Sequence, residues 1–174
     1  HVEFENIPSM EEIRSYRPKE TTTIHDRHGN VFATLFLENR VVVPLDRISP
    51  FLADAVVAAE DARFFSHGGI NMLSIVRAAV ENNRAGAVKQ GGSTITQQLA
   101  RNMYLSHERT LERKLAETVI AFRLENIFSK SEILEKYLNE IYFGNGAWGA
   151  EVASRTYFGK SASELTLSEA ACLA

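Results

Sequence analysis

The stretch that decides the fold is Gly91-Gly92-Ser93-Thr94-Ile95-Thr96-Gln97-Gln98-Leu99. Two glycines interrupt the chain, and Thr94 followed by Gln97 three residues later forms a capping box, which predicts a helix from here to about Tyr104. The free N–H groups at a helix start favour anions, and hydroxyl and amide side chains can hydrogen-bond sugar hydroxyls or phosphate oxygens. Ordinary capping needs only one of these side chains, but two consecutive Gln favour a binding role.

Helix signals continue on both sides of this stretch. Pro50 follows Ser49 at a first helical position, and Thr166 with Glu169 forms a second capping box. In the helix after Thr110, an apolar stripe is predicted to face the core; it consists of Leu111, Leu115, Val119 and Phe122. Helices are predicted over about residues 50–65, 72–84, 94–104, 110–128, 130–141 and 150–157, and from 166 onward.

The first 45 residues differ from the rest. Thr21–Ile24 and Val31–Leu37 are rich in β-branched and aromatic residues and flank the turn-prone residues 26–30, which predicts a β-hairpin. Val41–Val43 predicts a third short strand, and residues 8–17 a short helix. We therefore expect a mainly α fold with a small N-terminal β-hairpin, divided into a linker segment at 1–45 and a larger domain at 46–174.

Composition limits the function. A chain of 174 residues fits one domain, and 45% hydrophobic with 24% charged residues excludes a disordered chain. The net charge of −3 argues against a basic nucleic-acid binder, and Cys172 as the single cysteine excludes an internal disulfide framework. Residues 77–123 nevertheless carry eight Lys or Arg and four acids, so this segment is +4 and the remainder −7. A basic segment in an acidic chain suggests an anionic ligand, although a solvated helix face is the commoner explanation.

Two acidic positions could carry chemistry. Glu60 lies near the end of an otherwise apolar helix, so its carboxylate would be partly desolvated, a setting that suits a general base. A surface acid pair with Asp61 is the alternative. Glu117 shares one helix face with Arg113 and Lys114. These cations could hold a pyrophosphate, or they could simply make intrahelical ion pairs.

The stretch Ser93–Leu99, followed by Arg101 and the basic helix from Arg109, also resembles a helix-turn-helix by eye, which would be a DNA-binding module. Against this, residues 104–109 contain no Gly turn, and Glu108, Glu112 and Glu117 interrupt the basic face.

Together the motifs resemble the peptidoglycan glycosyltransferase domain of class A penicillin-binding proteins and of monofunctional transglycosylases, a glycosyltransferase family numbered 51. Five ordered stretches over about residues 45–174 carry the resemblance. They are EDARFFSHGG at 60–69, GSTITQQLARN at 92–102, RKLAE at 113–117, ILEKYLNEIYFG at 133–144 and LTLSEAA at 165–171. The hairpin resembles the segment that links this domain to its membrane anchor in bifunctional members.

The resemblance implies a lysozyme-like, two-lobed helical fold and polymerisation of lipid II into β-1,4-linked glycan strands with release of undecaprenyl pyrophosphate. It implies that Glu60 is the general base and that Glu117 is a second essential acid near the donor pyrophosphate. It also implies the substrate-binding residues: Lys114, Arg109 and Arg101 at the pyrophosphate, Ser93, Gln97, Gln98 and Asn102 at sugar and phosphate subsites, and Arg63 and Tyr142 supporting the cleft. No tightly bound cofactor is implied; a divalent cation, Mg²⁺ or Mn²⁺, could accompany the pyrophosphate and contact Glu117.

The residue chemistry agrees with inverting transfer. One base is needed on the attacking side and charge compensation on the leaving side, whereas a lysozyme-like muramidase needs a protonated acid and a second carboxylate without a basic cluster. The hydrolase is the alternative enzyme. Arg101 stands where the family usually has Lys, which keeps the charge but changes the geometry.

The chain has no initiator Met and no spanning segment, so we expect a piece of a longer protein that lacks the end of its domain. The resemblance further implies the outer, periplasmic face of the bacterial cytoplasmic membrane as location, with the anchor outside this piece. It implies lipid II, the undecaprenyl-pyrophosphate glycan chain and the membrane surface as partners, no nucleic acid, and in some members a C-terminal transpeptidase domain.

Overall fold

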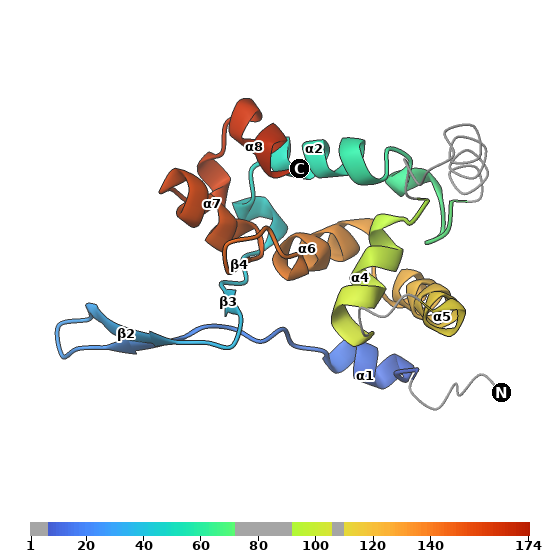
Figure 1. Cartoon of the computed structure of the whole chain (residues 1–174), viewed down its shortest axis with the longest axis horizontal. Coiled ribbons are helices and arrows are strands. Elements are labelled where there is room, and N and C mark those ends of the chain that lie inside the picture. The colour runs from blue at the N-terminus through green and yellow to red at the C-terminus, as the bar shows by residue number, and fades with distance from the viewer. Residues whose placement is uncertain (1–6, 72–91, 106–109) are drawn as a thin grey trace. The chain divides into compact units, whose positions relative to one another are not determined.

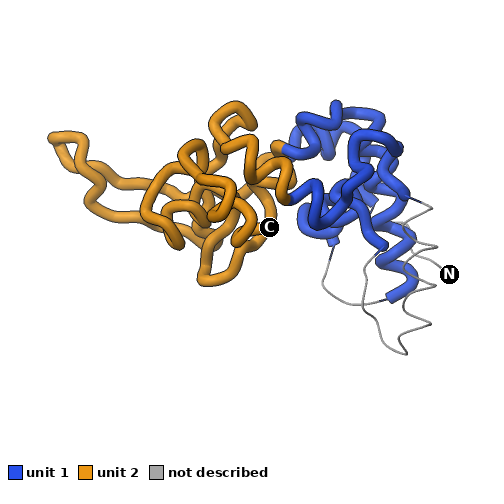
Figure 2. Tube along the Cα trace, turned by 90° about the horizontal axis from the view of Figure 1, so that it is seen from above, with its two compact units in different colours: residues 1–16, 56–134 blue, residues 17–55, 135–174 orange. Residues whose placement is uncertain are grey.

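The structure is a computed structural model that describes residues 7–71, 92–105 and 110–174 (Figure 1). The chain forms two units that interleave along the sequence (Figure 2). Unit 1 comprises residues 1–16 and 56–134, and unit 2 comprises residues 17–55 and 135–174. The predicted division at residue 45 remains a prediction. No helix within the described ranges is long and apolar enough to cross a membrane.

The mainly α prediction is confirmed, and most helices lie where they were expected. The described helices are α1 (Met10–Ser15), α2 (Pro50–Glu60), α4 (Ile95–Tyr104), α5 (Leu111–Ile127), α6 (Lys130–Glu140), α7 (Ala150–Phe158) and α8 (Leu167–Leu173). α2 ends at Glu60, earlier than predicted, and a separate 3-10 turn at Phe64–Ser66 follows it. The helix predicted over 72–84 lies outside the described residues.

Local capping explains where the helices begin. The Thr94 hydroxyl accepts a hydrogen bond from the Gln97 N–H, and the Gln97 side chain accepts one from the Thr94 N–H, both at 3.1 Å. Thr166 and Glu169 form the same reciprocal pair at the start of α8. Hydrogen bonds from Lys160 and Thr166 lower the pKa of the Glu169 carboxyl to about 2. Both capping boxes were readable from sequence because their partners lie three residues apart.

The centre of unit 1 is the packing of α4 against α5. Fully buried apolar side chains on these two helices are Ile95, Leu99, Ala100, Ile120, Ala121 and Leu124. α1 packs on α5 as well, with Ile13 buried. The Arg123 side chain donates to the Pro8 carbonyl, which fastens the chain just before α1 to the same helix.

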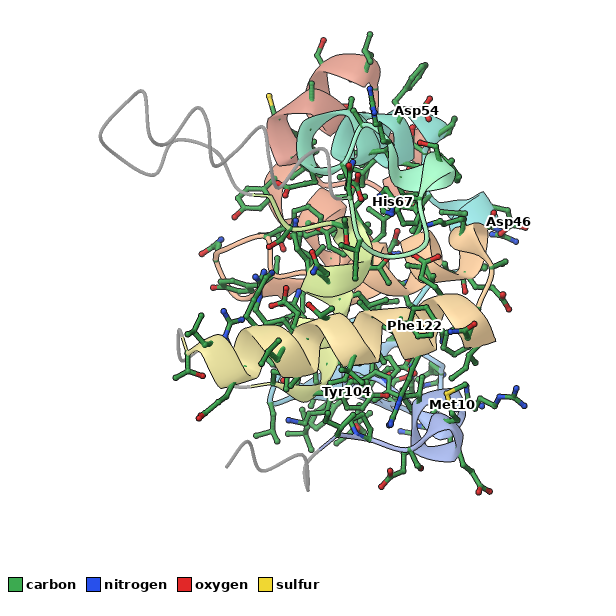
Figure 3. All side chains as sticks on the ribbon, turned by 90° about the vertical axis from the view of Figure 1, so that its right-hand side faces the viewer. Met10, Asp46, Asp54, His67, Tyr104 and Phe122 are labelled. Carbon is green, nitrogen blue, oxygen red and sulfur yellow. The ribbon has the colours of Figure 1, made fainter. Side chains whose placement is uncertain are left out.

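The core-facing side of α5 differs from the prediction. Leu111 is 85% exposed, Leu115 52% and Phe122 60%, so three of the four stripe residues face outward, whereas Val119 is half-buried (Phe122 is labelled in Figure 3). The buried side carries Glu117 and Ile120 instead. The prediction failed because both sides of α5 hold apolar residues at helical spacing. Glu117 can lie on the buried side because its charge is compensated there.

This correction predicts effects of very different size for two truncations on one helix. Ile120→Ala should destabilise the protein by about 2–5 kcal/mol, since it leaves a cavity in the core. Leu111→Ala should change the free energy of unfolding by about 0.5 kcal/mol or less, since an exposed side chain loses little burial. Urea unfolding of both variants measures the difference, and a larger loss for Leu111→Ala would restore the original prediction.

Unit 2 contains two small sheets. β1 (Thr22–His25) pairs antiparallel with β2 (Val31–Leu35), which confirms the hairpin. β3 (Asn39–Arg40) pairs parallel with β4 (Ala147–Trp148). The third strand predicted at Val41–Val43 is wrong: those residues are not in a strand. A strand forms at 39–40 because these residues pair with β4, which lies more than 100 residues further along the chain. Local β-propensity carries no information about such a distant partner.

Arg40 holds this second sheet together. Its side chain is fully buried, and its guanidinium donates to the carbonyls of Asn139 and Lys19, both at 2.9 Å. Glu38 forms an ion pair with it at 2.8 Å, and the Trp148 ring lies 5.3 Å from the guanidinium carbon. A buried cation is tolerated only when it is paired and hydrogen-bonded, and these contacts meet that requirement.

Candidate functional site

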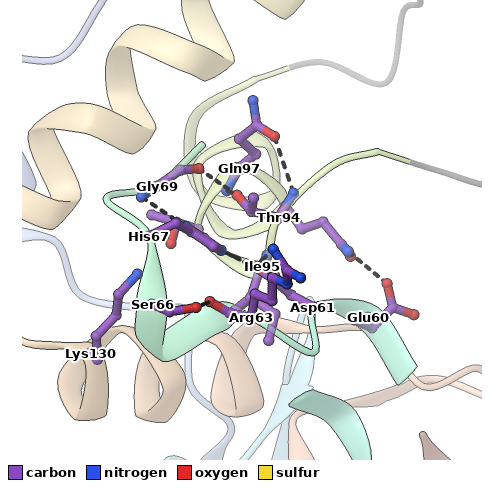
Figure 4. Close-up of polar contacts among 12 residues, drawn as sticks. Glu60, Asp61, Arg63, Ser66, His67, Gly69, Thr94, Ile95, Gln97 and Lys130 are labelled. Atoms are coloured by element: carbon purple, nitrogen blue, oxygen red, sulfur yellow. Dashed lines mark hydrogen bonds and ion pairs between the residues drawn. The ribbon is translucent and has the colours of Figure 1, made fainter. Parts of the chain in front are cut away.

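The site is built around the end of α2 and the start of α4, both in unit 1. Directly after Glu60, the buried Asp61 carboxylate contacts His67 Nε2 at 2.8 and 3.0 Å and accepts a bond from the Ile95 N–H at 3.3 Å (Figure 4). The Gly69 N–H donates to His67 Nδ1 at 3.2 Å. Because Nδ1 accepts that bond, the network assigns the ring proton to Nε2, which donates to Asp61.

Gly69 completes the lock between this loop and α4. Its carbonyl accepts a bond from the Thr94 hydroxyl at 2.6 Å. Its φ of +87° suits glycine, and an added Cβ would lie 3.0 Å from Glu125 Cγ and 3.4 Å from the Ala121 carbonyl oxygen. These contacts hold the loop against α4 and α5 directly after the end of α2.

Glu60 is the last residue of α2 and is exposed. Its Oε2 accepts a hydrogen bond from Gln98 Nε2 at 2.7 Å. The apolar residues before it predicted partial desolvation, but Ala58 and Ala59 are themselves exposed and do not shield the carboxylate. Gln98 orients the Glu60 carboxylate through this hydrogen bond. The loop at 61–69 follows Glu60 directly and holds this end of α2 against α4.

Glu117 is the opposite kind of acid, because its side chain is fully buried. Arg113 Nη1 donates to Glu117 Oε2 at 3.0 Å, and Lys114 Nζ donates to Glu117 Oε1. Lys114 Nζ also donates to Ser93 Oγ at 2.8 Å. The Lys114 side chain stays 41% exposed, so the cation that Glu117 holds still reaches solvent.

The segment 93–98 connects the two acids. Ser93, just before the cap of α4, contacts Lys114, whereas Gln98 in the first turns of α4 contacts Glu60. The start of α4 thus contacts both the exposed carboxylate of Glu60 and the ammonium group of Lys114, whose side chain is 41% exposed. The structure brings together five of the predicted site residues: Glu60, Gln98, Ser93, Lys114 and Glu117.

The remaining predicted residues are placed differently. Gln97 is buried, and its amide serves the capping box and donates to Thr118 Oγ1 at 3.4 Å. Tyr142 belongs to unit 2, where its ring lies 4.8 Å from that of Trp148. Arg63 is exposed, Arg101 and Asn102 are half-buried on α4, and Arg109 lies outside the described residues.

Two contributors were missed by sequence reasoning. His67 stood alone in the sequence, and only the folded loop brings it to Asp61. Arg113 was considered as a cation that could hold a pyrophosphate or pair with Glu117, but it was not included among the predicted site residues. Its Nε is buried and has no hydrogen-bond partner in the described part of the chain. The sequence signal for the contact between Asp61 and His67 was that both residues lie within the stretch EDARFFSHGG at 60–69.

The residues do not fit a metal ion bound directly by Glu117. Both of its carboxylate oxygens already accept bonds from cationic side chains. Within residues 7–71, 92–105 and 110–174, no group of three or more His, Cys, Asp or Glu side chains is arranged to hold a metal ion. A cation that arrives with a pyrophosphate remains a prediction, and no step below depends on one.

Known proteins match the chain closely. The model of the transglycosylase family matches residues 28–174. Penicillin-binding protein 1A of Aquifex aeolicus is 46% identical over 98% of the chain, and those of Neisseria flavescens and Rickettsia prowazekii are 43% and 40% identical over 99% and 97%. The chain spans only 24%, 22% and 22% of these relatives, about a quarter of their length.

Proposed function

Because the chain belongs to the transglycosylase family of peptidoglycan glycosyltransferases, we propose that it polymerises lipid II into β-1,4-linked glycan strands and releases undecaprenyl pyrophosphate. The growing strand on its pyrophosphate is the donor and lipid II is the acceptor. The observation that carries the proposal is the difference between the two acids: Glu60 is exposed and oriented, whereas Glu117 is buried and neutralised.

Glu60 is the general base of this proposal. It removes the proton from the 4-hydroxyl of the acceptor sugar while that oxygen attacks C1 of the donor sugar. A base acts only with a free carboxylate within reach of the proton. Glu60 Oε2 is engaged with Gln98, and no described contact engages Oε1. An exposed carboxylate with one hydrogen bond supports this role, whereas the Glu117 carboxylate is fully buried and each of its oxygens accepts a bond from a cation.

Lys114 serves the leaving side of the reaction. As the C1–O bond breaks, the electron pair goes to the pyrophosphate, and a fixed cation stabilises the developing charge. Glu117 holds Lys114 in place and acts as a positioning residue. The proposed contacts to pyrophosphate and sugar are Ser93, Arg101, Arg109, Gln98 and Asn102. The proposed supports of the cleft are Arg63 and Tyr142. The role of Gln97 is to cap the start of α4.

The alternatives fit less well. A muramidase needs a protonated acid and a second carboxylate beside the reacting sugar, but Glu117 is enclosed by Arg113 and Lys114. A DNA-binding helix would need several cations on one open face, yet Arg113 is committed to Glu117 and the exposed first turn of α5 carries the acid Glu112. We propose that the enzyme acts on the outer face of the cytoplasmic membrane. Its lipid-linked substrates would be bound there, and a transpeptidase module of the longer protein would lie on the same side.

The full-length gene product should convert purified lipid II into polymer that muramidase digests, as seen on a gel. Transfer is expected because the site pairs one free base with one held cation. The same preparation should not solubilise purified cell wall. Lysis of the cell wall without polymer formation would support the hydrolase instead. If the folded protein showed neither activity, this result would contradict both proposed enzymes.

A further inference from the structure

Glu117 has more positive charge beside it than its own charge requires. Its side chain is fully buried, and Arg113 Nη1 and Lys114 Nζ donate to separate oxygens of its carboxylate. Among the described residues, these two cations are the hydrogen-bond partners of that carboxylate. The three side chains therefore combine two positive charges with one negative charge, which leaves a net charge of +1 at this place.

Another buried glutamate of the chain shows that one cation is sufficient. Glu151 in α7 is also buried, and its Oε1 accepts a hydrogen bond from Arg155 Nε at 2.7 Å in an i,i+4 ion pair. Its Oε2 accepts from neutral groups instead, the Ser161 hydroxyl at 3.1 Å and the Ala162 N–H at 2.8 Å. A buried carboxylate thus needs one cation and enough hydrogen-bond donors. The second cation at Glu117 adds a charge that neutralisation does not require.

The two cations at Glu117 differ in what else they can reach. The Arg113 side chain is only 15% exposed, and its Nε is buried with no hydrogen-bond partner in the described part of the chain. The Lys114 side chain is 41% exposed. An ammonium group has three N–H donors, and Lys114 uses two of them, on Glu117 and on Ser93 Oγ at 2.8 Å. Arg113 is therefore confined to Glu117, whereas Lys114 keeps one donor for an anion that arrives from solvent.

The net charge decides how strongly that anion is attracted. Without Arg113, Lys114 and Glu117 would form a neutral ion pair, and the carboxylate would cancel most of the attraction between the ammonium group and a pyrophosphate. With Arg113 present, its guanidinium offsets the carboxylate from the buried side. The positive charge of Lys114 then remains effective toward solvent.

We propose that Arg113 is a positioning residue of the donor site, which balances the charge of Glu117 so that the whole charge of Lys114 is available to the pyrophosphate. Arg113 acts through Lys114 and does not contact the ligand. This inference rests on the proposed function, because that function assigns the pyrophosphate to Lys114.

Binding of inorganic pyrophosphate to the full-length gene product tests the inference without any turnover. Isothermal titration calorimetry at low ionic strength measures the affinity. Arg113→Met should weaken binding at least about tenfold, because it removes one positive charge near the ligand, and Arg113→Lys should recover part of the loss. Arg155→Met is the matched control, because it breaks an i,i+4 pair with another buried glutamate, and it should bind pyrophosphate as tightly as the parent.

A double variant separates charge balance from direct contact. Arg113→Met combined with Glu117→Gln removes one cation and one anion together, so the net charge of +1 is restored on Lys114. Its affinity for pyrophosphate should return to within about threefold of the parent. If Arg113 contacted the ligand itself, the double variant would bind as weakly as Arg113→Met. The double variant leaves no buried carboxylate short of a cation, so it decides the question even if Arg113→Met alone does not fold.

Three results would overturn the inference: parental affinity in a folded Arg113→Met variant, a double variant that stays more than about tenfold weaker than the parent, or a parent that does not bind pyrophosphate. Thermal unfolding checks the fold of each variant. Polymerisation of lipid II by the parent is measured separately. If polymer forms while the affinities contradict the inference, then the proposed function stands and only the role of Arg113 is lost.

Discussion

Replacing Glu60 with Gln is expected to lower the rate of lipid II polymerisation about 10²- to 10⁴-fold, which is the contribution of a positioned general base. Glutamine has the shape of glutamate and can still accept the bond from Gln98 Nε2. It cannot take up the proton of the acceptor hydroxyl. The loss should therefore appear in the rate and not in the fold.

Initial rates of polymer formation by the full-length protein measure the effect, and thermal unfolding checks the fold. Asp54→Asn is the matched control, because Asp54 is another exposed acid of α2. Like Glu60→Gln, this substitution replaces a carboxylate with an amide. It should retain near-parental activity. A Glu60→Gln variant that polymerises at near-parental rate would remove the assignment of the base, and an equal loss in Asp54→Asn would point to α2 as a whole.

Sequence predicted the local features of the fold well, because their causes are local. The start of α4 follows from Thr94 and Gln97, and the start of α8 from Thr166 and Glu169. The side of α5 that is buried could not be predicted in this way. It depends on which face α4 covers, and apolar residues occupy both sides of the helix.

The candidate site shows the same boundary between local and tertiary causes. Glu60 and Lys114 could be identified by motif, since each motif is a continuous stretch of sequence. The environment of Glu60 could not, because the exposure of the last turn of α2 depends on tertiary packing. The contact between Asp61 and His67 also depends on a folded loop, and no spacing rule connects those two side chains.

Glu117 illustrates why the basic cluster was ambiguous in sequence. Intrahelical ion pairs and a pyrophosphate site were treated as alternatives, but the structure contains the pairs without excluding the site. Arg113 satisfies one oxygen of the buried carboxylate, and Lys114 satisfies the other while it also bonds to Ser93 on a different element. An intrahelical pair can therefore be the device that orients a cation for a ligand.

Lys114→Ala is expected to weaken binding of a pyrophosphate-bearing donor, or of a phosphoglycolipid inhibitor, about 10- to 100-fold. A hydrogen bond to a charged group contributes about 1.5–3 kcal/mol, and Lys114 is the cation that both contacts Ser93 and reaches solvent. The fold should survive, because Glu117 keeps its bond from Arg113 at 3.0 Å. Equilibrium binding by fluorescence anisotropy with a labelled inhibitor measures the change.

Two further variants decide between a ligand contact and a structural ion pair. Lys130→Met removes another paired cation of unit 1, whose partner is Glu125 at 2.6 Å, and it should leave inhibitor affinity unchanged. Lys114→Arg keeps the positive charge and should recover part of the inhibitor affinity. The recovery should be partial because a planar guanidinium group replaces a compact ammonium group. If Lys114→Ala binds the inhibitor as tightly as the parent while its melting temperature falls, then Lys114 serves only to neutralise Glu117, and the leaving pyrophosphate must be stabilised by other cations.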